Sequence, residues 1–254
     1  MPTGPIITLI TDFGLTDFYV AAMKAVLLHY AADATLIDIT HQIYRHDLRS
    51  ASFTLERAIS SFPSGTIHLA VVDPGVGTDR RLMVADINKS IAICPDNGLI
   101  TWAWKNHPGS QAHELTWRPA TTSSTFHGRD IMSPVAGMIA AGHSRDDLTG
   151  QQIDPVLLDM ELAKTSDGQV IHIDHFGNAT TNIPASMIAT GMTAAQIKNL
   201  SIPMRNSYAD VAFGEPVALI GSSNLLEIAI RNGSAADVLN LHLGDCVIME
   251  QAPQ

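Results

Sequence analysis

Short apolar runs alternate with amphipathic segments along the first 150 residues of the chain. The runs Ile6–Ile10, Thr35–Ile39 and Ile67–Val72 have the length and the β-branched content of buried strands. Between them, apolar positions recur at helical spacing in Phe18–Ala31 and in Asp47–Phe62. This alternation predicts a mainly parallel sheet that is covered by helices on both faces.

Four more elements continue the pattern as far as residue 141. They are two predicted strands and then two predicted helices, at Leu82–Ile87, Ile91–Cys94, Gly98–Asn106 and Gly128–Ala141. The last of these helices carries small residues, which allow it to pack closely against a neighbour.

The pattern changes after a polar stretch at Asp146–Thr165. Short apolar runs separated by Gly, Asn and Ser follow, with one predicted helix near Ser234–Asn240. The predicted strands are at Val170–Ile173, Ile183, Leu200–Met204, Val217–Ile220, Ile228–Ile230 and Val247–Met249. We therefore predict an N-terminal α/β domain at residues 1–160 and a smaller, antiparallel β-barrel-like domain at residues 161–254.

The composition of the chain limits the kinds of molecule that it is expected to bind and the compartment in which it is expected to occur. Fifteen Lys and Arg residues against 25 Asp and Glu residues give a formal net charge of −10, which disfavours a nucleic-acid or anionic-membrane surface. The two cysteines, Cys94 and Cys246, predict neither a disulfide framework nor a zinc-binding cluster. The first residues lack the basic segment of a signal peptide, and no apolar run approaches the length of a membrane span. We therefore expect a cytoplasmic protein.

Polar residues follow the ends of the predicted parallel strands, where ligands bind in such sheets. Asp12 follows the first strand, and Asp73 opens a glycine-rich loop after the third. Arg80 could form an ion pair with the Asp73 carboxylate and keep it charged. The alternative is that these aspartates cap helices or stabilise turns, as Asp commonly does before Gly. The loop has neither the Gly-Lys-Ser/Thr ending of a Walker motif nor the glycine spacing of a dinucleotide fingerprint.

Histidines are further candidates for chemistry. His127 precedes a predicted helix, whose positive end favours a neutral, basic imidazole. His172 and His175 would point to opposite faces of a strand, which disfavours a shared metal. A metal-dependent hydrolase remains an alternative, built from Asp12, Asp38, His41 and Asp73. From these residues alone, the sequence predicts an enzyme with carboxylates at strand ends.

Seven segments occur together in one order: Thr11-Asp12-Phe13-Gly14 with Asp17, Asp38-Ile39-Thr40-His41, Val72-Asp73-Pro74-Gly75-Val76-Gly77 with Arg80, Pro95-Asp96-Asn97-Gly98, Phe126-His127-Gly128-Arg129-Asp130, Ile173-Asp174-His175-Phe176-Gly177-Asn178 and Ile230-Arg231-Asn232-Gly233-Ser234-Ala235-Ala236. In this combination the chain resembles the S-adenosylmethionine (SAM) hydroxide adenosyltransferases over roughly residues 6–249. These adenosine-forming SAM hydrolases are related to the SAM-dependent fluorinase and chlorinase. The resemblance implies that water attacks the 5′-carbon of SAM to give adenosine and L-methionine, with SAM as the substrate and with no cofactor or metal.

The resemblance also implies an assembly and a set of site residues. The expected assembly is a homotrimer that binds SAM between the N-terminal domain of one subunit and the C-terminal domain of the next. The implied catalytic residues are Asp73, Arg80 and His127. The implied contacts with the ribose and the methionine end are Asp12 and Asp17, and those with adenine are Phe176, Asn178, Tyr208, Arg231 and the backbone near Gly233. The rest of the substrate would be lined by Asp174, Ser222, Ser223 and Glu227.

The halogenating relatives differ from this chain at positions that affect the choice of nucleophile. They carry Tyr and Ser at the positions of His127 and Gly128, and a non-acidic aromatic residue at that of Asp73. They also have a long insertion where this chain has only the fifteen residues 82–96. The residue differences favour water over halide as the nucleophile. Against this, His46 stands where the halogenases place a tryptophan near the sugar, so packing there is expected to differ.

Other functions remain open beside hydrolysis. One is a SAM- or adenosine-binding module whose hydrolysis is incidental, and another is a SAM-dependent halogenase. A SAM methyltransferase is disfavoured because no matching Gly-rich loop follows the first strand.

Overall fold

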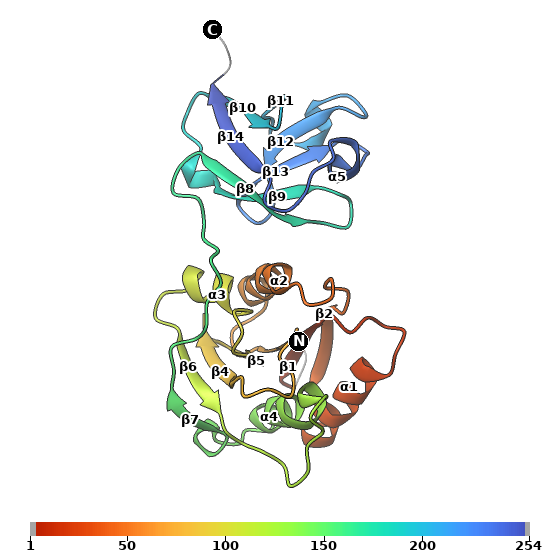
Figure 1. Cartoon of the computed structure of the whole chain (residues 1–254), viewed down its shortest axis with the longest axis vertical. Coiled ribbons are helices and arrows are strands. Elements are labelled where there is room, and N and C mark those ends of the chain that lie inside the picture. Colours follow the sequence, from red (N-terminus) through yellow and green to blue (C-terminus); the bar gives the residue numbers. More distant parts are fainter. Residues whose placement is uncertain (1–3, 252–254) are drawn as a thin grey trace. The chain divides into compact units, whose positions relative to one another are not determined.

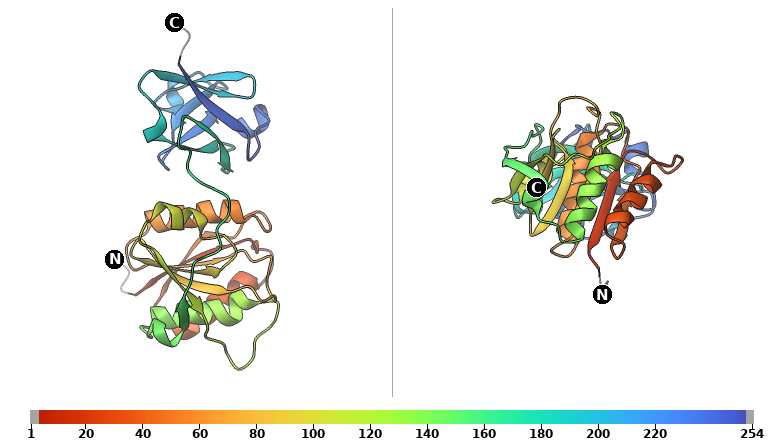
Figure 2. Two further views of the ribbon diagram at one scale, coloured as in Figure 1. Left: turned by 60° about the vertical axis from the view of Figure 1, so that its left-hand side comes forward. Right: turned by 90° about the horizontal axis from the view of Figure 1, so that it is seen from below.

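The computed structural model of the protein describes residues 4–251 (Figures 1 and 2). The chain divides into two units, residues 1–160 and residues 161–254. Each unit is built around a sheet of seven strands. Helices accompany the sheet of the first unit, and the sheet of the second unit is antiparallel, which confirms the predicted fold class.

The sheet of the first unit has the strand order β2-β1-β3-β5-β4-β6-β7. Its strands are β1 (Ile6–Thr11), β2 (Thr35–Thr40), β3 (Ile67–Val71), β4 (Leu82–Ile87), β5 (Ser90–Pro95), β6 (Gln111–Leu115) and β7 (Thr149–Gln152). The first four strands in this order pair in parallel, as predicted. The remaining pairs are antiparallel. Asn88 and Lys89 join β4 to β5 with φ values of 49° and 62°, the backbone of a type I′ hairpin turn.

Helices cover both faces of this sheet (Figure 1). They are α1 (Tyr19–Tyr30), α2 (Leu48–Ser61), α3 (Thr101–Asn106) and α4 (Ser133–Ala140). α1 and α4 lie side by side on one face (Figure 2, right), and α2 and α3 cover the other. Successive residues of β3 alternate between these layers, because Leu69 packs with α1 and α4 while Ala70 packs with α2 and α3. Burial on both faces explains the nearly continuous apolar runs of the parallel strands.

The second unit has the strand order β11-β10-β14-β8-β9-β13-β12. Its elements are β8 (Asp167–Ile173), β9 (Ala179–Pro184), β10 (Met192–Ile197), β11 (Leu200–Pro203), β12 (Pro216–Ile220), β13 (Leu225–Ile230), α5 (Ala235–Val238) and β14 (Cys246–Gln251). A bridge between Met204 and Ala218 brings the two end strands together. The sheet is therefore nearly closed into a barrel around an apolar core that includes Ile183, Leu226 and Val247.

The two cysteines differ in environment. Cys94 on β5 is fully buried, whereas Cys246 at the start of β14 is exposed, and both are free thiols. Burial raises the pKa of the Cys94 thiol, and the Asp96 and Asp73 carboxylates raise it further. Within residues 4–251, no helix has the length and apolar character needed to cross a membrane.

A buried histidine links the stability of the first unit to pH. His68 on β3 is fully buried, and its ring Nδ1 lies 2.8 Å from the hydroxyl oxygen of Thr8 on β1. Its Nε2 makes no hydrogen bond within the described residues. Burial lowers the pKa of His68 from 6.5 to about 4.

We expect this histidine to make the protein less stable in acid. The unfolded chain binds a proton near pH 6.5 and the folded chain near pH 4, so stability is complete above pH 6.5 and falls as the pH drops. The loss amounts to about 3 kcal/mol at pH 4. Urea denaturation at pH 7 and at pH 4.5 should show a smaller difference for His68→Gln than for the wild type. An equal difference in the two proteins would contradict this prediction.

Candidate active site

The structure distributes most of the predicted site residues over two pockets, one in each unit. The pocket in the first unit has a volume of about 290 Å³, and Asp12, Asp73 and His127 line it. We call it the triad pocket, after the hydrogen-bonded group of Asp73, Arg80 and His127 described below. The barrel pocket, in the second unit, has a volume of about 850 Å³. Its lining includes seven of the predicted residues: Asp174, Phe176, Asn178, Tyr208, Ser222, Glu227 and Gly233.

Asp12 and Asp73 lie where two neighbouring parallel strands end. β1 and β3 are paired so that Thr11 lies opposite Val71, which brings the residues after both strands to the same edge of the sheet. The loop after Asp73 then turns at Gly77, which has a φ of 83°. A Cβ atom at Gly77 would lie 2.7 Å from the carbonyl oxygen of Ser124, so glycine allows this loop to approach the segment before His127.

Asp73, Arg80 and His127 form one hydrogen-bonded group, which we call the triad. Arg80 Nε donates to Asp73 Oδ1 at 2.7 Å, and Arg80 Nη2 donates to Asp73 Oδ2. The same Nη2 lies 2.9 Å from His127 Nδ1. The side chains of Asp73 and Arg80 are only 6% and 10% exposed, so water screens their ion pair weakly. The triad therefore places a charged carboxylate and an imidazole against one pocket.

The contact with Arg80 determines which nitrogen of His127 carries the proton. A guanidinium group only donates hydrogen bonds, so His127 Nδ1 must accept. The single proton of a neutral imidazole is then on Nε2. Burial and the Arg80 charge lower the pKa of His127, although the Asp73 carboxylate opposes them, so the neutral ring persists at neutral pH. His127 thus offers an N–H donor at Nε2.

The segment after His127 brings the imidazole close to the sheet. Gly128–Met132 forms a wide, π-helical turn, so the predicted helix Gly128–Ala141 becomes α-helical only at Ser133. Gly128 is buried, and a Cβ atom there would lie 3.2 Å from Val71 Cγ1. Asp130 accepts the backbone N–H of Ser123 at 2.8 Å, which anchors the loop before His127. Close packing at Gly128 therefore holds His127 beside β3.

Asp12 is fixed by a loop that follows β2. Its Oδ2 accepts the backbone N–H of His46 at 2.9 Å, and its side chain is 9% exposed. His46 adopts a left-handed φ of 65°, which is uncommon for a residue with a side chain. Arg45 and His46 both line the triad pocket. Asp17, by contrast, is exposed and is not among the residues that line this pocket.

In the barrel pocket, Asp174 organises the turn between β8 and β9. Its Oδ1 accepts the backbone N–H groups of Phe176 and Asn178, both at 2.9 Å. Its Oδ2 accepts the side-chain amide of Asn178 at 3.0 Å. The Phe176 side chain is left 73% exposed at the pocket. The turn therefore presents an aromatic face beside a fixed amide.

A second acidic group lies deeper in the barrel pocket. Glu227 on β13 is 8% exposed, and it accepts a hydrogen bond from Tyr208 Oη at 2.5 Å. Burial raises the pKa of Glu227, and the Asp174 charge adds to this, whereas the Tyr208 hydrogen bond lowers it. Glu227 and Tyr208 thus form a polar pair in the pocket wall.

Two predicted residues, Ser223 and Arg231, are not among the side chains that line the barrel pocket. Arg231 Nη1 donates to the carbonyl oxygens of Ala209 and Val211 at 3.0 and 2.6 Å. Its guanidinium lies over the Phe213 ring, 4.3 Å from the ring centre. In the structure, Arg231 therefore braces the segment that follows Tyr208.

Sequence reasoning missed several lining residues because they lie in loops without hydrophobic periodicity. The polar ones are Arg45 and Thr125 in the triad pocket, and Asn206, Ser207 and Asn232 in the barrel pocket. For Asn232 a signal was present, since it directly precedes Gly233 in one of the seven segments quoted above.

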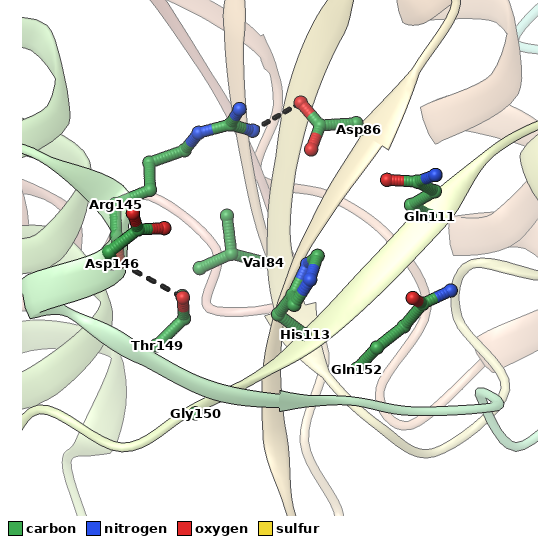
Figure 3. A pocket seen from close by; sticks show the side chains of 9 residues that line it. All are labelled: Val84, Asp86, Gln111, His113, Arg145, Asp146, Thr149, Gly150 and Gln152. Atoms are coloured by element: carbon green, nitrogen blue, oxygen red, sulfur yellow. Dashed lines mark hydrogen bonds and ion pairs between the residues drawn. The ribbon is translucent and has the colours of Figure 1, made fainter.

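A third cavity, of about 380 Å³, lies over β4, β6 and β7 (Figure 3). The strand register places Val84, His113 and Gln152 in one row across its floor. Arg145 at its rim is paired with Asp86. The predicted site residues lie elsewhere.

The residues of the metal-hydrolase alternative are divided between two places. Asp12 and Asp73 line the triad pocket, whereas His41 and Asp38 are not among its lining residues, and His41 Nε2 lies 3.0 Å from Asp38 Oδ1. Across residues 4–251, no group of three or more His, Cys, Asp or Glu side chains is arranged to hold a metal ion.

These features define a two-unit protein with an Asp-Arg-His triad at the edge of an α/β sheet and a polar-aromatic pocket in a β-barrel. Comparison with known protein families shows to which family the chain belongs. The model of the SAM hydroxide adenosyltransferase N-terminal domain matches residues 7–149, and that of the C-terminal domain matches residues 168–248. The chain belongs to the SAM hydroxide adenosyltransferase family, which confirms the resemblance seen in the sequence.

Individual relatives agree with this assignment. A protein of Thermus thermophilus named (R)-S-adenosyl-L-methionine hydrolase is 37% identical over 249 residues, which cover 92% of this chain and 95% of the relative. A fluorinase of Nocardia brasiliensis is 28% identical over 284 residues, covering 94% and 95% of the two chains. A crystal structure of an uncharacterized conserved protein from Thermotoga maritima has a TM-score of 0.90 at 32% identity, and the match covers 96% of this chain and all of the other.

Proposed function

We propose that this protein hydrolyses SAM to adenosine and L-methionine by in-line attack of water on the 5′-carbon. The observation that carries the proposal is the triad, with its charged carboxylate and neutral imidazole against one pocket. The relatives named as SAM hydrolases support the choice of substrate, because two of them match 92% and 96% of this chain.

The difficult part of this reaction is the activation of the water nucleophile. Methionine departs as a neutral thioether, so the leaving group needs no Lewis acid, and we propose that no metal or cofactor takes part. Water has a pKa of about 15.7 and must lose a proton as it attacks. A positioned general base typically contributes about 10²–10⁴-fold to such a step. The triad offers one group to accept the proton and another to orient the water molecule.

Asp73 accepts the proton in this mechanism, and His127 orients the water. A carboxylate has about four lone-pair positions, and the two N–H groups of Arg80 leave room for a water molecule. His127 Nε2–H donates to the water oxygen, because Nδ1 is occupied by Arg80. Arg80 weakens Asp73 as a base but holds the carboxylate and the imidazole in a fixed relation. The Asp73 charge also attracts the sulfonium centre of the substrate.

Substitution of His127 tests this division of roles. Alanine removes the Nε2–H donor, so kcat should fall about 10²-fold while the Kd for SAM changes little. Glutamine places an amide N–H near the position of Nε2 and should retain more activity than alanine. Steady-state kinetics and SAM titration of both variants check this. Equal loss in both variants would remove His127 as a donor, and unchanged turnover would remove it from the mechanism.

The remaining substrate contacts follow from the two pockets. We assign the ribose to Asp12 and the adenine to the barrel pocket, where the exposed face of Phe176 offers a stacking surface beside Asn178. We infer that the protein forms a homotrimer in which each site combines the triad pocket of one subunit with the barrel pocket of the next. Leu15 and Phe18 support such an assembly, because both are more than 60% exposed directly after the Asp12 segment.

We place this activity in the cytoplasm, with SAM as the partner and without nucleic acid or membrane. Two free thiols fit a reducing compartment, and a net charge of −10 disfavours polyanionic partners.

Incubation of the purified protein with SAM tests the proposed function. Adenosine and methionine should appear in equal amounts, with or without EDTA, and chromatography measures both. Retention of bound SAM without product would instead support a SAM-binding module. Loss of activity in EDTA that added metal restores would overturn the metal-free mechanism.

The product should remain adenosine even in concentrated chloride. A halide site must replace the water shell of a small anion with hydrogen-bond donors. Gly128 supplies no hydroxyl group, and Asp73 places a negative charge at the site. At about 4 Å and an effective dielectric constant of about 20, repulsion between Asp73 and a halide is on the order of 4 kcal/mol. Mass spectrometry should detect no substantial 5′-chloro-5′-deoxyadenosine, and finding it would contradict water as the preferred nucleophile.

A further inference from the structure

A row of polar side chains begins at Thr11, the residue before Asp12. His41, which follows β2, is 3% exposed, and its ring Nδ1 lies 2.9 Å from the hydroxyl oxygen of Thr11 at the end of β1. On the other side of the ring, Nε2 lies 3.0 Å from Asp38 Oδ1, at the distance of an ion pair although without the direction of a hydrogen bond. Lys24 of α1 completes the row, because its Nζ lies 2.6 Å from Asp38 Oδ2.

One arrangement of protons fits the contacts in this row. In the neutral form of the His41 ring, a proton on Nε2 faces the Asp38 carboxylate, which can only accept hydrogen bonds. His41 Nδ1 then accepts the hydroxyl proton of Thr11. This leaves the lone pairs of Thr11 Oγ1 free to accept the backbone N–H of Phe13, at 3.3 Å.

The order Asp38, His41, Thr11 resembles the acid-histidine-hydroxyl arrangement of enzymes that use a serine or threonine nucleophile. Thr11, however, cannot attack a substrate. Its exposed fraction is 0%, and its Oγ1 is held between the His41 ring and the Phe13 amide. A nucleophile must be able to reach the reacting atom. The row therefore acts on the backbone of this chain.

Both ends of the segment 11–14 are tied to His41. Thr11 contacts the imidazole ring, and the backbone N–H of Gly14 donates to the His41 carbonyl oxygen at 2.7 Å. Asp12 and Phe13 lie between these two anchors, and both line the triad pocket. The Asp12 carboxylate is held from the other side by the backbone N–H of His46, five residues after His41. One short stretch, residues 41–46, thus determines where the Asp12 carboxylate lies.

We propose that His41 is a positioning residue for substrate binding, which holds the segment 11–14 through Thr11 and through its own carbonyl group so that Asp12 meets the ribose of SAM. The identity of the ligand rests on the proposed function. The anchoring of the segment does not, because it follows from contacts within the first unit.

Two substitutions each remove one partner of the hydrogen bond between Thr11 Oγ1 and His41 Nδ1. His41→Gln removes the Nδ1 acceptor, and Thr11→Val removes the hydroxyl group with little change of shape. Each should raise the KM for SAM about five- to tenfold, the effect of one buried hydrogen bond, and change kcat less than about twofold. Thr11→Ser keeps the hydroxyl group and should retain the wild-type KM. The double variant should be little worse than either single one, because both remove one interaction.

His68→Gln provides a matched control. His68 is also buried in this sheet, and its Nδ1 lies 2.8 Å from the hydroxyl group of Thr8, again on β1. This contact has no connection to the segment 11–14, so His68→Gln should lower thermal stability without raising KM. A rise in KM of the same size in His68→Gln would overturn the positioning role and leave a general effect of destabilisation. Unchanged KM in both His41→Gln and Thr11→Val would also overturn it.

Amide hydrogen exchange of the intact protein separates this inference from the proposed function. A peptide that covers residues 11–17 should exchange faster in Thr11→Val and His41→Gln than in the wild type, and His68→Gln should leave it unchanged. If the wild type fails to hydrolyse SAM while this difference persists, the proposed function is wrong and the anchoring holds. If exchange of this peptide is the same in all four proteins, His41 does not anchor the segment.

Discussion

Replacement of Asp73 by asparagine is expected to lower kcat for SAM hydrolysis about 10³-fold, within the range for loss of a general base. Asparagine has nearly the same shape and can still accept a hydrogen bond from Arg80, but it cannot take a proton from water at neutral pH. It also leaves the buried charge of Arg80 without a counterion, close to a cationic substrate. KM should therefore rise as well, although by a smaller factor than kcat falls.

Adenosine release at saturating SAM measures this effect directly. Thermal unfolding of the variant provides the control, because a protein that has lost its fold would give the same low activity for another reason. A folded Asp73→Asn protein that keeps more than about a tenth of the wild-type kcat would show that Asp73 is not the proton acceptor.

Mixing two inactive variants should restore about a quarter of the wild-type activity. One variant, Asp73→Asn, has a defective triad pocket and an intact barrel pocket. The other combines Phe176→Ala with Asn178→Ala, which damages the barrel pocket and leaves the triad intact. In trimers that assemble at random from equal amounts, about one site in four joins an intact triad pocket to an intact barrel pocket of the next subunit.

The recovered activity distinguishes shared sites from sites that lie within one chain, because the two arrangements predict different values. Every chain in the mixture carries one damaged pocket, so sites formed within chains would give no recovery. The trimers should be assembled by co-expression with two affinity tags and purified through both. Purification through both tags removes the homotrimers, and each remaining mixed trimer has one intact site in three. Recovery near a third in this sample supports shared sites, whereas purified mixed trimers as inactive as the parents would overturn the proposed assembly.

Hydrophobic patterning identified the buried parallel strands of the first unit but missed its polar strands, and it also missed β10 of the second unit, although Ala195 and Ile197 of that strand are buried. β1 and β3 are apolar because helices cover both of their faces. β6 and β7 read Gln-Ala-His-Glu-Leu and Thr-Gly-Gln-Gln, and one of their faces lines the polar cavity of Figure 3, so no apolar run marks them. In β9, Thr181 is fully buried with its hydroxyl group bonded to the Leu226 carbonyl oxygen at 3.0 Å. A partner 45 residues away in the sequence cannot be recognised from local pattern.

The candidate site was predictable where chemistry depends on strand ends and short motifs. Asp73 and Arg80 are seven residues apart in one loop, so their ion pair could be anticipated. The role of Arg231 could not, because its contacts with Ala209 and Val211 depend on how a distant loop returns to β13. The same holds for His46, whose backbone amide reaches Asp12 only after β2 has paired with β1.

The unequal environments of the two cysteines make the protein suitable for site-specific fluorescent labelling without mutation. The thiolate is the species that reacts with maleimide dyes, and Cys94 is both inaccessible and held in its thiol form. Cys246 is exposed at the start of β14, so a dye should attach to the second unit alone. Mixing preparations that carry donor and acceptor dyes at this position would test the proposed trimer, because exchange of subunits would produce energy transfer, with every residue of the triad left as it is in the native chain.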